Sequence, residues 1–230
     1  MDDPFLFLPL EEPVFFIDTC AFSIKDSGPG MGLAWSSKSL EEIQIETIRL
    51  NMLNRRLEDR KNWLVTSEVI QEIENGNRGL EIRTREDFIS QTHKVVYSKL
   101  LHSRKQTLEL ISQSERNANH PDNLINELSA QISTIEPLVR TRFKGRTRPE
   151  LETDIHLIAT ALAYSQQIPI AIYTRDNQII TTFGILSHEL KTEKTYILSD
   201  DEEIISAYEF ARRILSSRRK YKARFAGISK

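Results

Sequence analysis

Four acidic residues, spread over most of the chain, could do chemistry together. Asp18 directly follows a short apolar run at 14–17 (VFFI), and Asp176 follows another at 168–174 (IPIAIYT). Short runs rich in β-branched and aromatic residues are typical of buried strands. In open α/β sheets, ligands bind outside the carboxyl ends of the strands. We therefore expect Asp18 and Asp176 at the same edge of one sheet.

The other two acids, Glu72 and Asp154, belong to helices predicted beside such strands. Glu72 follows a strand expected at 63–66, and Asp154 opens a helix expected at 153–165, with Thr153 as its N-cap. Four carboxylates in one crevice repel one another, by about 4 kcal/mol for unit charges about 4 Å apart at intermediate dielectric. A divalent cation removes this cost, and Mg²⁺ and Mn²⁺ prefer oxygen ligands. Because such an ion activates water and stabilises charge on phosphate, the pattern favours phosphodiester hydrolysis.

Each acid also has a simpler explanation. Asp18 and Asp176 suit turns at strand ends, and Asp154 suits the positive end of a helix. Glu68 lies four residues before Glu72 on the same helical face, so it is the alternative ligand. The placement of all four acids together, rather than any single one, indicates a site.

The order of elements predicts an α/β fold with a mostly parallel sheet, because strands alternate with helices. Gly76 is expected to end a short helix at 67–75, and 26–32 (DSGPGMG) is expected to form a loop. The block at about 80–140 is interpreted as a helical insertion or an enlarged helical layer. The other predicted elements are helices at 39–60, 86–115, 122–139 and about 201–217, and a strand at 195–199.

The segments around the acids resemble the PIN-domain family of metal-dependent ribonucleases. VFFIDTCAF is similar to the first strand of that family, with its Asp-Thr ending. LVTSEVIQEIENG resembles the second strand and helix, and TDIHLIATALAYSQQIPIAIYTRDNQI resembles the third segment. Residues 80–145 show no such match.

The resemblance implies a three-layer α/β/α fold, here with an enlarged helical insertion. We expect one domain over 1–210 and a basic C-terminal tail at 211–230. The implied activity is that of a Mg²⁺- or Mn²⁺-dependent endoribonuclease, a hydrolase that cuts single-stranded RNA. The implied catalytic metal ligands are Asp18, Glu72, Asp154 and Asp176. Thr19 and Thr174 would hydrogen-bond and orient these acids.

Positive charge is concentrated in two segments. Residues 140–148 (RTRFKGRTR) hold five basic residues and no acid, and 211–230 hold eight and no acid, which leaves 18 basic against 33 acidic residues elsewhere. Such cations bind phosphates without reading bases, and Phe143 suits stacking on a base. The predicted substrate-binding residues are Arg140, Arg142, Lys144, Arg146, Arg148, Arg175 and Asn177.

Composition narrows the remaining classes. The only cysteine is Cys20, which excludes an internal disulfide and a Cys-based zinc site; we expect it in core packing. His156 points away from Asp154 around their helix, so a structural role is expected for it. The sequence shows no signal peptide and no apolar run of roughly 20 residues, so we expect a cytoplasmic protein without a membrane partner.

Several alternatives stay open. One is a catalytically inactive PIN-like module that binds RNA or protein. Another is a toxin with an antitoxin partner, although the chain is longer than the compact toxins of the family; a homodimer and a preference for DNA are also open. An unrelated α/β phosphohydrolase with Asp18 as nucleophile would need a second Asp two residues on, where the chain has Cys20.

Overall fold

The structure is a computed structural model that describes residues 13–21, 39–59, 63–87, 89–117, 122–143, 150–198 and 204–226. The loop expected at 26–32 and the candidates Lys144, Arg146 and Arg148 lie outside the described residues. The chain divides into two compact units. We call Ile17–His120 the helical unit, and Met1–Phe16 with Pro121–Lys230 the α/β unit.

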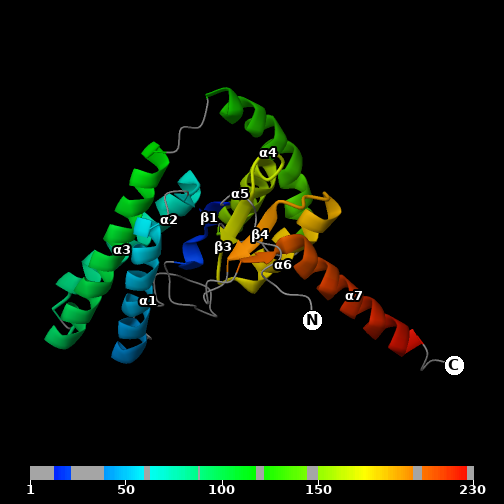
Figure 1. The fold of residues 1–230 in the computed structure, drawn as a ribbon. Coiled ribbons are helices and arrows are strands. Elements are labelled where there is room, and N and C mark those ends of the chain that lie inside the picture. The colour runs from blue at the N-terminus through cyan, green and yellow to red at the C-terminus, as the bar shows by residue number, and fades with distance from the viewer. Residues whose placement is uncertain are drawn as a thin grey trace. The chain divides into compact units, whose positions relative to one another are not determined.

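The described strands form one sheet in the order β2-β1-β3-β4-β5 (Figure 1). β3 runs parallel to β4, and β4 runs antiparallel to β5. β1 begins level with β3, since the Val14 N–H donates to the Pro169 carbonyl at 2.9 Å. The predicted α/β class with a mostly parallel sheet is confirmed, but β5 was not predicted. The strands are β1 Val14–Ile17, β2 Trp63–Leu64, β3 Ile170–Tyr173, β4 Thr195–Leu198 and β5 Ile204–Ser206.

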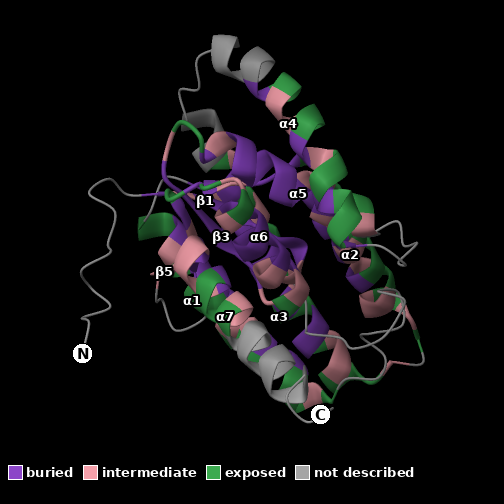
Figure 2. Cartoon of the chain, turned by 90° about the vertical axis from the view of Figure 1, so that its right-hand side faces the viewer, coloured by how far each residue is buried: buried purple, intermediate pink, exposed green. Residues whose placement is uncertain are grey.

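The α/β unit buries its strands under helices. All four residues of β3 are buried, which explains its unbroken apolar sequence (Figure 2). α5 packs on β3 and on α4, while α7 packs on β4 and on α6. Phe16 of β1 meets Tyr164 of α5 edge to face, with ring centroids 5.4 Å apart. These helices are α4 Asp122–Arg142, α5 Glu150–Tyr164, α6 Asn177–Glu189 and α7 Ala207–Ala226.

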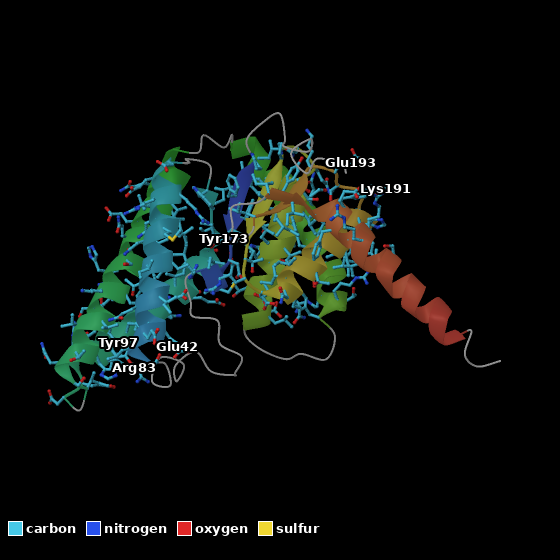
Figure 3. The ribbon with its side chains drawn as sticks, turned by 60° about the horizontal axis from the view of Figure 1, so that its bottom comes forward. Glu42, Arg83, Tyr97, Tyr173, Lys191 and Glu193 are labelled. Carbon is cyan, nitrogen blue, oxygen red and sulfur yellow. The ribbon has the colours of Figure 1, made fainter. Side chains whose placement is uncertain are left out.

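The helical unit is built around α3, which packs on both α1 and α2. Its elements are the 3₁₀ turn η2 Thr19–Ala21, α1 Leu40–Asp59, the strand β2, α2 Ser67–Arg85 and α3 Gln91–Asn117. Figure 3 labels one residue on each long helix, Glu42 on α1, Arg83 on α2 and Tyr97 on α3. The apolar spacing that predicted α1 is its buried face, which includes Ile43, Leu50, Leu53 and Leu57. The sequence period therefore identified the core side of this helix.

Several predicted element boundaries were wrong. α4 continues to Arg142, so the basic segment from 140 begins inside a helix rather than a loop. α5 begins at Glu150, which places Thr153 within the helix and not at its N-cap. The C-terminal helix starts only after β5, at Ala207, and runs to Ala226, so most of the predicted tail is helical in backbone.

Gly76 does not end α2, contrary to the prediction. The helix continues through it to Arg85, because the position is packed against a buried arginine. A Cβ atom at Gly76 would lie 2.8 Å from Nη2 of Arg104, so a larger residue would force that guanidinium to shift. The glycine serves a close approach between α2 and α3 rather than a helix stop.

The two glycines of α2 give a matched pair for a stability test. Gly79→Ala should raise the free energy of unfolding by about 0.5–1 kcal/mol, because alanine is the better helix former and nothing lies within 4 Å of the new Cβ. Gly76→Ala should give no gain or a loss, because its Cβ meets Arg104. Urea denaturation of both variants measures this, and an equal gain at both positions would contradict the assigned packing.

Candidate functional site

Asp18 lies directly after β1 and is buried, with 3% of its surface exposed. Burying a carboxylate is costly unless hydrogen bonds compensate. One is supplied by Cys20, whose Sγ donates to Oδ2 of Asp18 at 2.6 Å. The tight turn η2 makes this contact possible, since the Ala21 N–H bonds back to the Asp18 carbonyl at 3.0 Å. Cys20 is half-buried and bound to the candidate ligand, so the expectation of simple core packing was wrong.

Glu72 meets the same turn from α2. Oγ1 of Thr19 donates to Oε2 of Glu72 at 2.7 Å, and Thr19 is itself buried. Glu72 is placed by the start of the helix, where Thr66 is the N-cap and accepts the Val69 N–H. The structure thus brings Asp18, Thr19 and Glu72 together within the helical unit. Glu68, the alternative ligand, accepts a bond from Oγ of its neighbour Ser67 at 3.3 Å.

Arg49 of α1 fixes the far side of this turn. Its Nη2 donates to the Ala21 carbonyl, and its Nε donates to Oε1 of Glu46 at 2.6 Å. Glu46 is 5% exposed although it is charged. Sequence analysis missed both residues, but a signal was present. Glu46 falls between Ile43 and Leu50 at core-facing helical spacing, where an acid needs a buried partner.

Arg104 of α3 is a buried cation close to this pair. Its Nε donates to Oδ1 of Asn77 at 2.7 Å, which ties α3 to α2. Burial lowers the pKa of Arg104 to about 10, nearby Glu46 opposes this shift, and Arg49 adds to it. The side chain therefore stays charged at neutral pH. Arg104 therefore connects α3 to α2 through Asn77 and interacts electrostatically with Glu46 of α1.

In the α/β unit, Asp176 is the N-cap of α6. Its Oδ1 accepts the Gln178 N–H at 2.6 Å, and Oγ1 of buried Thr174 accepts the Asp176 N–H at 3.1 Å. The strand-to-helix connection after β3 is therefore held by two side-chain bonds. Among the described residues, Oδ2 of Asp176 accepts no hydrogen bond, so the carboxylate keeps acceptor capacity beyond the cap.

Asp154 is half-buried in α5, in the same unit. It does not open the helix as expected, because α5 starts four residues earlier. His156, two residues on, pairs with Glu136 of α4 through Nδ1 and Oε1, 2.9 Å apart. That contact agrees with the structural role predicted for His156.

The basic candidates that the structure describes are mostly engaged. Arg140 forms a bidentate pair with Glu152, with bonds of 2.5 and 2.6 Å, and Arg142 pairs with Glu189. The pKa of Arg140 is raised by the hydrogen bond to Glu152. These pairs are exposed, and such pairs contribute about 0–1 kcal/mol, so a phosphate could replace the carboxylates. Phe143 is 3% exposed, which makes the predicted base stacking wrong.

Two further candidates flank Asp176: Arg175 is half-buried and Asn177 is exposed in the first turn of α6.

Each unit contributes two of the four acids. Within the part of the chain that the structure describes, no three His, Cys, Asp or Glu side chains are grouped so as to hold a metal ion.

No described helix is long and apolar enough to span a membrane. No family model, curated protein or solved structure matches the chain.

The cap of α6 can be separated from any chemistry of Asp176 by substitution. Asp176→Ala should lower the free energy of unfolding by about 1 kcal/mol, because the Gln178 N–H loses its acceptor. Asp176→Asn should leave stability nearly unchanged, since Asn is an equally good N-cap. Thermal or urea unfolding of the two variants checks this, and equal stability of both would rule out the cap.

The Thr19 hydroxyl can be tested in the same way. Thr19→Val keeps the shape but removes the donor to Glu72, and should cost about 1 kcal/mol of folding free energy. Thr19→Ser keeps the hydroxyl and should lose clearly less. Guanidinium unfolding curves measure the difference. A valine variant as stable as the serine variant would show that the bond contributes nothing.

Proposed function

We propose that this chain is a Mg²⁺- or Mn²⁺-dependent nuclease of the PIN type that hydrolyses single-stranded RNA, with Asp18, Glu72, Asp154 and Asp176 as metal-binding carboxylates. The observation that carries the proposal is the turn after β1. Asp18 in this turn has a buried carboxylate that accepts a bond from Cys20, and the carboxylate of Glu72 accepts a bond from Thr19 of the same turn. Two acids around one buried turn raise the electrostatic cost of folding unless a cation offsets it. A purely structural turn requires neither.

The sheet supports the same assignment. β1 and β3 are neighbours, each has four residues, and they start level through the bond between Val14 and Pro169. Asp18 follows the end of β1, and Thr174 and Asp176 follow the end of β3. Ligand sites of α/β sheets lie outside such carboxyl ends.

The donor set fits a hard divalent ion, because all four proposed ligands offer carboxylate oxygens. Asp176 can cap α6 through Oδ1 and still offer Oδ2. Bare carboxylates repel one another, so the proposal requires the ion to draw the acids together. When bound, the ion would supply an activated water and stabilise charge on the scissile phosphate.

The chain's own residues orient the proposed ligands. Thr19 donates to Oε2 of Glu72. The Cys20 thiol donates to Asp18, and Arg49 holds the turn at the Ala21 carbonyl. Such supporting bonds restrict the directions in which carboxylates point, and their loss typically weakens metal affinity or activity 10–100-fold.

Substitution of single acids tests the proposal. The wild type should cut labelled single-stranded RNA with Mn²⁺ or Mg²⁺ and stop in EDTA. Asp18→Asn and Glu72→Gln should lower cutting by at least about 100-fold, because each removes a metal ligand. Glu74→Gln is the matched control, since Glu74 lies on the same helix but is exposed and pairs with Arg78; it should cut like wild type. Labelled DNA run in parallel reports the preferred nucleic acid.

Metal binding gives an independent readout. Mn²⁺ should raise the melting temperature of the wild type and of Glu74→Gln, and raise that of Asp18→Asn less, because ligands that bind only the folded state stabilise it. Equal cutting by the wild type and Asp18→Asn would identify a contaminant. RNA binding without any metal-dependent cutting would replace the proposal with a PIN-like binding module.

A further inference from the structure

The helical unit carries an open groove between α1 and α3. It encloses about 510 Å³, within the usual range of ligand sites. α3 contributes Lys94, Lys99 and His102, and α1 contributes the polar side chains of Thr47 and Asn51. None of these residues belongs to the acidic positions of the proposed metal site. The groove is therefore a separate feature of this unit.

The groove is positively charged and uncompensated. Among the described residues that line it, none is acidic, and the sequence of α3 holds no acid from Gln91 to Leu108. Within the part of the chain that the structure describes, Lys94 and Lys99 form no ion pair. Lys105, on the same helix but outside the groove, pairs with Glu81. Cations left without partners in a concave surface attract polyanions.

The other lining side chains suit a ribose–phosphate chain. Asn51 is held in place, since its Oδ1 accepts from Oγ of Ser103 at 2.8 Å, which leaves its amide group able to donate. Hydroxyl and amide groups of this kind bond to phosphate and sugar oxygens. His102 is the only ring among the described lining residues, and it is exposed and able to stack on a base.

We propose that this groove binds the sugar–phosphate backbone of a single-stranded nucleic acid, with Lys94 and Lys99 on phosphates and His102 against a base. The inference rests on the proposed nuclease function for the identity of the strand, and it assigns the helical unit a strand-holding role. Binding here is independent of base identity, because the lining offers charge and hydrogen bonds to the backbone.

An acidic protein partner fits the groove less well. The cores of protein interfaces are apolar and rich in aromatic residues. Here Val95 is the single apolar side chain among the described lining residues, and the others are polar or charged. A surface with this composition is typical of contacts to a hydrated, charged chain.

Fluorescence anisotropy in EDTA tests the groove without any cutting. The probe is a short labelled single-stranded RNA of mixed sequence, titrated with wild type, Lys94→Gln/Lys99→Gln and Lys105→Gln. The double variant should bind at least about tenfold more weakly, and its salt slope should fall by about 1.4, because two phosphate contacts are lost. Lys105→Gln removes a charge from the same helix and should change the affinity less than about twofold. Lys94→Arg/Lys99→Arg should bind like wild type.

If Lys105→Gln weakened RNA binding as much as the matched single variants Lys94→Gln and Lys99→Gln, the inference would be overturned. The loss of affinity would then follow from net charge alone. Unchanged binding by the double variant would overturn it as well. If a poly-glutamate peptide bound as tightly as the RNA and competed with it, the groove would be assigned to an acidic protein partner instead of a nucleic acid. The readout is separate from the nuclease test: loss of cutting in Asp18→Asn, with full RNA binding in EDTA, would leave the groove intact.

Discussion

The buried carboxylate of Asp18 is the constraint around which the helical unit is arranged. A charge with so little exposure must be offset by nearby donors, and the Cys20 thiol, two residues on, provides one. The η2 turn brings the thiol there, since the Ala21 N–H donates to the main-chain carbonyl of Asp18. The next contacts pass outward, from Thr19 to Glu72 and from the Ala21 carbonyl to Arg49. Each bond links the turn to a different long helix, so the position of one acid depends on the packing of two helices.

That packing is itself polar at its centre. Glu46 and Arg104 are buried and Arg49 is half-buried. Arg49 donates to Glu46, and Arg104 donates to Asn77. Buried charges of this kind contribute little net stability. Removing one partner nevertheless leaves the other as an uncompensated buried charge, which carries a large desolvation cost. An apolar replacement could hold the helices together. It could not offer a hydrogen bond to the Ala21 carbonyl, and the turn would lose that support.

Much of the framework was predictable because local periodicity and tertiary burial agree. β1, β3 and α1 follow from short apolar runs and a 3.6-residue stripe, whereas α6 was not predicted. Prediction failed where a distant partner overrides the local signal. Gly76 resembles a helix stop until Arg104 is known to fill the space beside it, and Thr153 resembles a cap until three helical residues precede it. β5 is short, with two of its three residues half-buried and one exposed, so it had no strong apolar run.

The sequence was enough to identify the candidate acids, but not the hydrogen bonds that they form. Nothing in the local pattern distinguishes Glu72 from Glu68, which share a helical face, and only the contact with Thr19 separates them. The pairing of Arg140 with Glu152 was hidden for a similar reason, since the acid lies twelve residues away on another helix. Charge counting along a chain finds concentrations of one sign and overlooks neutralisation across space.

The close packing of α7 on α6 carries a mechanical consequence. At Gly184 an added Cβ would lie 3.1 Å from a ring carbon of Phe210 and 3.2 Å from the Ala207 carbonyl, near the base of α7. α7 has 20 residues and so spans about 30 Å. Because a helix is stiff, a small change in angle where α7 is packed moves its far end by a larger distance. The smallest side chain in α6 therefore sets the direction along which the most basic stretch of the sequence extends.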